Sequence, residues 1–268
     1  MTKKLYFLLI SICYFLSTSA LYLFDLKDNT YLLSTFVFGF IAVMAYFFNI
    51  VFKSRRGVFF KIVFVSICAF SSMMILDAFP NLGLYPKLAY ITMSSFGLYL
   101  LLLSVNIYIV SEASEEMIPL LQPAKSVVYA YQLMSVFFSS IIIYKFAPYA
   151  ESPLISLGLQ LACFLVFYFL LFRSIRWFYM MEGNLISPEM KASTITRLSL
   201  FAYVFLVEVS ILLAFYPLED FARAMLVAGA LFITSNVING YLMHKVTTRL
   251  LIDSLLILAF LYLITNFL

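Results

Sequence analysis

The sequence predicts an all-α integral membrane protein with about nine transmembrane helices. First, 65% of its 268 residues are hydrophobic and 11% are charged, with a mean hydropathy of +1.05. A water-soluble domain of this size cannot bury so much apolar surface. Second, successive stretches reach the roughly 20 apolar residues that a bilayer core about 30 Å thick requires. Third, basic residues are concentrated in alternate loops.

The first four predicted spans cover 5–24, 31–52, 58–79 and 87–110. The first follows Lys3 and Lys4, and the small residues at 17–20 are also typical of a signal-peptide cleavage site. Because apolar sequence resumes after them and completes a membrane-crossing length, we favour a retained helix. Turn residues between Pro80 and Pro86 separate the third span from the fourth.

The remaining predicted spans cover 124–146, 153–172, 198–217, 222–243 and 250–268. Short loops join them, except for segment 173–197, where Gly183 and Pro188 interrupt the apolar sequence and basic residues lie at both ends. This composition predicts a cytoplasmic linker. The linker would separate a six-helix N-terminal bundle, residues 1–172, from a three-helix partial C-terminal bundle, residues 198–268.

The basic residues predict the orientation of the chain. With a cytoplasmic N-terminus, only Lys27, Lys87, Lys145 and Arg223 fall in outside loops, which leaves 13 of the 17 basic residues inside. This bias follows the positive-inside rule and places the C-terminus outside. The rule accounts for the basic loops without an acidic partner, so we expect no nucleic-acid partner. Short loops and compact spans favour a bacterial inner membrane.

Two cytoplasmic turns of the predicted topology resemble one another. One contains Arg55 and Arg56, and the other, roughly 190 residues later, contains Gly240, Lys245 and Arg249. Each turn joins two spans, the second and third in the first case and the eighth and ninth in the second. Duplicated halves of this kind are common in secondary transporters.

The second turn resembles the cytoplasmic loop signature of the major facilitator superfamily. Gly240, Leu242, Lys245, Arg249 and Ile252 occupy its glycine, leucine, first basic, last basic and aliphatic places. His244 stands in the acidic place, and the first turn keeps only the basic cluster. The resemblance implies secondary transport by alternating access. That family normally has twelve spans, so this chain would be a shortened member, or further helices would come from elsewhere.

Signatures of soluble enzymes are absent from the sequence, which has no Gly-rich phosphate loop and no nucleophile elbow. The single histidine, His244, cannot form a zinc site alone. The pair Glu115-Glu116 lacks the second histidine that an intramembrane metalloprotease needs. The three cysteines lie inside predicted spans without paired spacing, so each is expected to act as a small apolar residue. We therefore expect no enzymatic activity, metal or cofactor.

Glu208 is the main candidate for a functional residue, because it lies about halfway along the seventh predicted span. A carboxylate at the bilayer centre costs at least about 2.5–3.5 kcal/mol on insertion scales. Glu208 is therefore either a protonatable coupling or substrate site, or a protonated hydrogen-bond donor between helices. The sequence does not separate these two interpretations.

Amides and hydroxyls inside the spans are further candidates. Gln132, Ser135 and Ser139 fall on one face of the fifth predicted span by three- and four-residue spacing. The amides Asn106, Gln160, Asn236 and Asn239 also lie in or near the membrane core. Such groups commonly join helices at about 0.6 kcal/mol each. Together they would also fit a polar cavity, for which Gln132, Asn106 and Asn236 are the strongest contacts.

These observations favour secondary transport of a small solute, with Glu208 as a candidate proton-coupling residue. The alternative is a membrane scaffold, sensor or accessory subunit that moves no solute, because the second half is short and its loop signature is eroded. The expected partners are membrane lipid and a small solute. Another membrane protein or a second copy would be needed if the shortened half is completed from outside.

Overall fold

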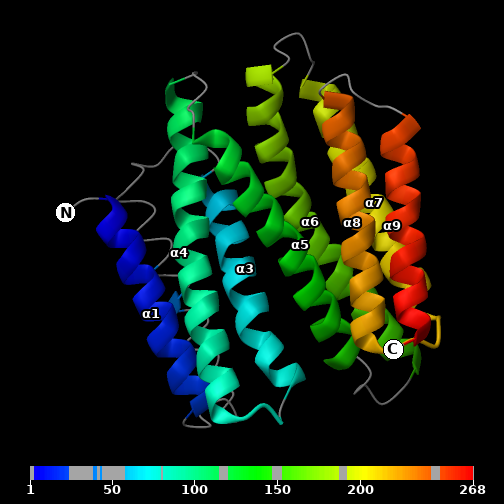
Figure 1. The fold of residues 1–268 in the computed structure, drawn as a ribbon, viewed down its shortest axis with the longest axis horizontal. Coiled ribbons are helices and arrows are strands. Elements are labelled where there is room, and N and C mark those ends of the chain that lie inside the picture. The colour runs from blue at the N-terminus through cyan, green and yellow to red at the C-terminus, as the bar shows by residue number, and fades with distance from the viewer. Residues whose placement is uncertain are drawn as a thin grey trace. The chain divides into compact units, whose positions relative to one another are not determined.

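The computed structural model describes residues 3–23, 39–40, 43, 58–79, 81–114, 120–146, 153–186, 192–242 and 248–267. Each element in these residues is an α-helix, and they contain no strand (Figure 1). The helices are α1 (Lys3–Leu23), α3 (Val58–Ala78), α4 (Leu84–Ser114), α5 (Leu121–Phe146), α6 (Pro153–Ile186), α7 (Ala192–Ala214), α8 (Asp220–Leu242) and α9 (Thr248–Phe267). The all-helical prediction is therefore confirmed for the described residues. The predicted span 31–52 lies outside them, apart from three helical positions.

Among the described residues, six helices are long and apolar enough to cross a membrane: α1, α4, α5, α6, α7 and α8. The described apolar part of α3 is shorter, and α9 is not among the six. Six such helices are compatible with an integral membrane protein. The full count of nine spans stays a prediction.

Proline residues mark the beginnings of three helices. Pro86, Pro123 and Pro153 each lie in the first turn of their helix, where the main-chain N–H would have no partner inside the helix. Between α3 and α4, Leu82 N–H donates to the Phe79 carbonyl across a tight turn. The turn residues that separate the third and fourth predicted spans therefore act as the sequence indicated.

The predicted linker 173–197 is helical over most of its described residues. Helix α6 continues to Ile186, and α7 begins at Ala192. A helix keeps its own hydrogen bonds when it leaves the bilayer, so basic residues and a glycine do not have to end it. The extension also packs, because Phe178 and Tyr179 are buried and Arg176 Nε donates to Thr196 Oγ1 over 3.0 Å.

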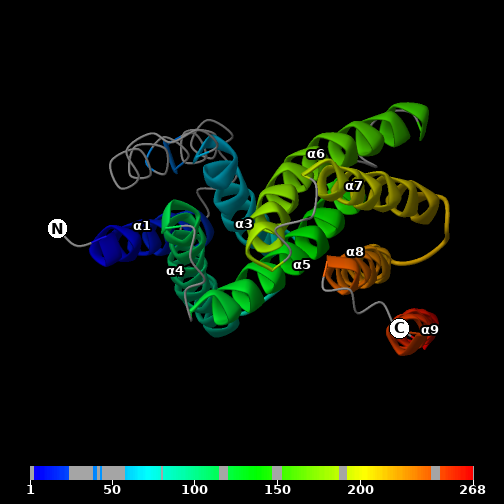
Figure 2. The ribbon, with the colours of Figure 1, turned by 90° about the horizontal axis from the view of Figure 1, so that it is seen from above.

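The chain forms two compact units, residues 1–131 and 132–268. In the first unit, α1 and α3 both pack against α4 (Figure 1). In the second, α6 packs on α7, α7 on α8 and α8 on α9, and the view from above shows α8 beside α9 (Figure 2). The boundary falls inside α5, between Tyr131 and Gln132, so this grouping differs from the predicted division into six helices and three.

Candidate functional site

Glu208 lies on the outward face of α7. Most buried residues of this helix follow a seam spaced by three and four residues: Ile195, Ser199, Ala202, Leu206 and Ser210. Val207 is buried beside this seam. Glu208 is exposed, and so are Phe201, Val204 and Leu212 at helical spacing from it. No hydrogen bond or ion pair joins the Glu208 carboxyl to a residue that the structure describes. The structure therefore places Glu208 away from the packed side of its own unit.

The other predicted contacts lie on three different helices. Gln132 is buried in α5, whereas Asn236 is half-buried in α8. Asn106 is half-buried in α4 of the first unit, and its buried Oδ1 has no hydrogen-bond partner among the described residues. Ser135 and Ser139 are buried like Gln132, so the polar face of α5 points inward as its spacing predicts.

Most of the predicted loop motif lies outside the described residues. Arg55, Arg56 and Lys245 belong to this group. Gly240 is buried near the end of α8, and Arg249 lies in α9, although the structure does not describe its side chain. His244, Glu115 and Glu116 are also outside the described part of the chain. The three cysteines are free, and no described group of acidic, cysteine and histidine residues is arranged to hold a metal ion.

A buried cluster of hydroxyl groups joins three helices of the second unit. Tyr168 of α6 lies 3.1 Å from Ser140 Oγ of α5 and 2.9 Å from Ser210 Oγ of α7, measured from its hydroxyl oxygen. Tyr144 of α5 donates its hydroxyl to the Ser210 carbonyl over 2.7 Å. We call these four residues the Tyr168 cluster. Its hydroxyl groups satisfy one another and a main-chain carbonyl inside apolar sequence.

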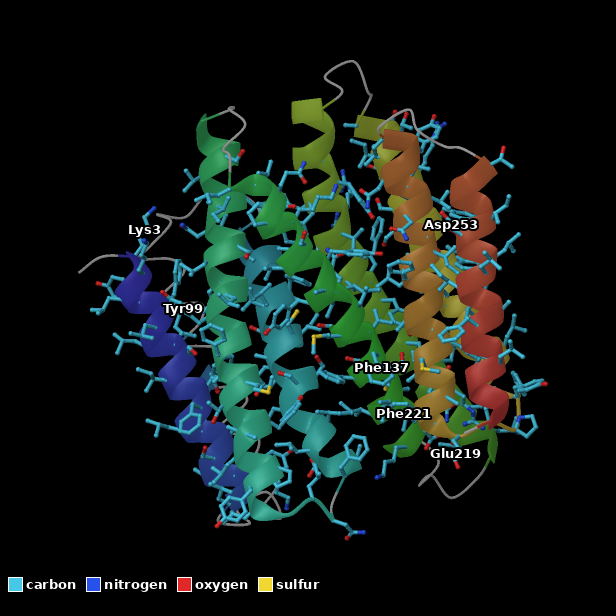
Figure 3. All side chains as sticks on the ribbon, viewed as in Figure 1. Lys3, Tyr99, Phe137, Glu219, Phe221 and Asp253 are labelled. Atoms are coloured by element: carbon cyan, nitrogen blue, oxygen red, sulfur yellow. The ribbon has the colours of Figure 1, made fainter. Side chains whose placement is uncertain are left out.

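Arg223 of α8 extends this cluster toward the loop between α7 and α8. Its guanidinium carbon lies 5.5 Å from the centre of the Tyr144 ring, a cation–π distance. The same group donates to the Asp220 carboxylate over 3.2 Å and to the Tyr216 carbonyl over 3.0 Å. Nearby, Phe137 and Phe221 meet edge to face with ring centres 5.2 Å apart (Figure 3). The arrangement fixes α8 against α5 and α7.

The first unit contains a second cluster of the same kind. Tyr14 of α1 donates to the Ala69 carbonyl of α3 over 3.1 Å and lies 2.9 Å from Ser72 Oγ. Tyr90 of α4 donates to the Ser72 carbonyl over 2.7 Å. These residues form the Tyr14 cluster. Ser11 adds a hydrogen bond from α1 to the Ser95 carbonyl of α4.

The sequence analysis predicted neither cluster. The available signal was position: Tyr14 and Tyr168 lie well inside apolar runs and not at their ends. A phenol at that depth needs a hydrogen-bond partner. Chemically, both clusters hold helices together. As defined by their described residues, the two clusters consist of neutral hydroxyl groups and main-chain carbonyls.

No protein-family model, curated protein or solved structure matches this chain. The resemblance of its loops to the major facilitator superfamily therefore stays a prediction.

Proposed function

We propose that this chain is a membrane transporter that moves a small solute by rigid-body movement of two helical units. The division of the chain into two compact units, each with its own buried hydroxyl cluster, carries the proposal. Alternating access is largely the rocking of one rigid bundle against another. The tyrosine hydrogen bonds within each unit supply the stiffness that such a movement requires.

Flux measurements in liposomes test the proposal. Purified protein is reconstituted, and a panel of amino acids, sugars, nucleosides and organic ions is supplied with and without a pH gradient. We expect saturable uptake of one class of solute, and none in protein-free liposomes. Absence of both binding and flux across the panel, with the protein folded, would favour a protein that moves no solute.

The same assay tests whether Glu208 couples proton movement to transport, as the sequence predicts. Glu208→Gln keeps the size and hydrogen bonding of the side chain but removes its titration, so uptake driven by a pH gradient should be lost. Glu219→Gln, in the exposed loop before α8, is the matched control and should leave uptake unchanged. Unaltered proton-driven uptake in Glu208→Gln would remove Glu208 from coupling without affecting the transport proposal.

The second candidate function is a scaffold or accessory subunit of a membrane complex. The outward position of Glu208 favours it, because a carboxyl among lipid-facing side chains is suited to meeting another protein. Under this proposal the purified protein moves no solute but forms an assembly of fixed stoichiometry. Light scattering of the detergent-solubilised protein, corrected for detergent, measures that stoichiometry.

A further inference from the structure

The outward face of α7, together with Phe215 in the turn that follows it, carries a second seam that no described helix covers. Its members are spaced alternately by three and four residues: Phe201, Val204, Glu208, Ile211 and Phe215. All of them are exposed except Ile211, which is half-buried. This spacing is the heptad pattern with which two helices pack side by side. The opposite seam of the same helix is already occupied inside its own unit.

Exposed apolar side chains alone indicate contact with lipid, and other helices show such faces. The outward face of α1 is formed by Leu5, Leu8, Ile12 and Leu16, without a charged residue. The seam of α7 differs because Glu208 lies at the middle of the apolar run 200–218. Lipid tails offer no hydrogen-bond partner to a carboxyl group. No described residue of this chain supplies such a partner, so a polar group of another protein surface would complete the seam by meeting Glu208.

The amino acids of α7 indicate which polar group would meet Glu208. The run 200–218 contains no lysine or arginine, so an identical helix offers no basic partner for Glu208. A protonated carboxyl group, however, both donates and accepts hydrogen bonds, which makes it complementary to a second carboxyl group. In a two-fold symmetric contact each residue near the axis meets its own copy. A single polar residue at a core position of a seam also fixes the register of two parallel helices.

We propose that two copies of this chain associate through α7, with the two Glu208 carboxyl groups hydrogen-bonded to each other at the centre of the contact. Both copies have the same orientation in the membrane, so their α7 helices run parallel, as this register requires. Phe201 and Phe215 pack on either side of the carboxyl pair. The inference concerns an interaction surface and does not depend on transport.

Energy transfer between labelled copies in liposomes tests this association. Wild-type protein should transfer energy well above random proximity, in a manner that depends on the protein-to-lipid ratio. Glu208→Gln should keep the association because its amide donates and accepts as well. Glu208→Leu should weaken it at least tenfold, with helix content unchanged by circular dichroism. The proposal would be overturned if energy transfer between wild-type copies stayed at the random level. It would also be overturned if Glu208→Leu copies transferred energy as efficiently as the wild type.

Two further pairs of variants locate the contact. Phe201→Ala should weaken association, whereas Phe260→Ala of α9 should not, although both side chains are 63% exposed. In a cysteine-free background, Val204→Cys on the seam should form a disulfide-linked dimer in membranes. Leu206→Cys, buried on the opposite face of α7, should not. Equal effects of the two members of either pair would show that α7 is not the contact, and a monomeric wild type would overturn the proposal.

Discussion

Individual tyrosines provide most of the described hydrogen bonds between helices. Tyr14, Tyr90 and Tyr144 each donate to a main-chain carbonyl of another helix, and Tyr168 bridges two serines. Such carbonyls already accept a hydrogen bond within their own helix, and a carbonyl oxygen has a second lone pair for the phenol. The tyrosines therefore join helices without disturbing the helical backbone.

Replacing Tyr168 by phenylalanine tests this role. Tyr168→Phe removes a hydroxyl that lies close to both Ser140 and Ser210, so the free energy of unfolding should fall by about 0.6–1.7 kcal/mol. Tyr241→Phe is the control, since its side chain is exposed, and it should cause no change. Thermal unfolding followed by fluorescence in detergent measures both. An unchanged transition in Tyr168→Phe would show that the buried hydroxyl contributes nothing.

The absence of a side chain at Gly97 of α4 leaves room for the Tyr131 side chain of α5. A Cβ atom added at Gly97 would collide with the Tyr131 hydroxyl oxygen and lie 3.3 Å from its ring carbon Cζ. Overpacking of this kind typically costs about 1–3 kcal/mol, so Gly97→Ala should lower the unfolding temperature.

Two variants separate this collision from a general effect of alanine. Gly158→Ala, where a Cβ atom would meet nothing within 4 Å, should be neutral or stabilising because alanine favours the helix. In a Tyr131→Phe background, Gly97→Ala should cost less than it does in the wild type. Equal costs in the two backgrounds would assign the effect of Gly97 to something other than this hydroxyl.

Helical periodicity in the sequence predicted which residues share a helix face. It did not predict which face packs inside the unit or which distant residues make contact. Helical spacing placed Gln132, Ser135 and Ser139 on one face, and all three are buried. The depth of Glu208 was apparent, but its outward direction depends on which face of α7 packs inside the unit. The partners of Tyr168 lie 28 and 42 residues away in the sequence, and no local pattern identifies them.

At the scale of the elements, hydropathy located the helices but not their ends. The predicted span 153–172 became α6, which continues to Ile186. Hydropathy reports where a segment leaves the membrane, whereas the helix ends where its hydrogen bonds end. Burial of Phe178 and the hydrogen bond from Arg176 to Thr196 of α7 stabilise the extension, and neither can be read from hydropathy.

The beginning of α8 depends on Arg223, which joins it to the end of α7. Lysine at this position would keep the charge but lose the planar group that reaches both Asp220 and the Tyr216 carbonyl. Arg223→Lys should therefore lower the free energy of unfolding by about 1 kcal/mol, of which the contact with the Tyr144 ring is part. Arg197→Lys, at an exposed position of α7, is the matched control. Chemical denaturation in mild detergent compares them, and equal stabilities would show that Arg223 is a simple surface charge.

For the whole molecule, composition was sufficient to predict an all-helical membrane protein. Six described helices have the required length and apolar character. The division into units was not predictable in the same way. The sequence interpretation chose segment 173–197 for its polar composition, whereas the boundary lies inside α5, a continuous helix without a break in hydropathy. Packing between distant helices determines such a boundary, and composition does not report it.

The orientation of the whole chain in the membrane is the last prediction. Nine crossings from a cytoplasmic N-terminus place the C-terminus outside, and 13 of the 17 basic residues then face the cytoplasm. Reporter fusions after Arg55, within 187–191 and after Lys245 should therefore read cytoplasmic, and a fusion after Leu268 should read external. A fusion point within 187–191 leaves α6 intact, because that helix continues to Ile186. A cytoplasmic reading at Leu268 would require an even number of crossings and would remove one of the predicted spans.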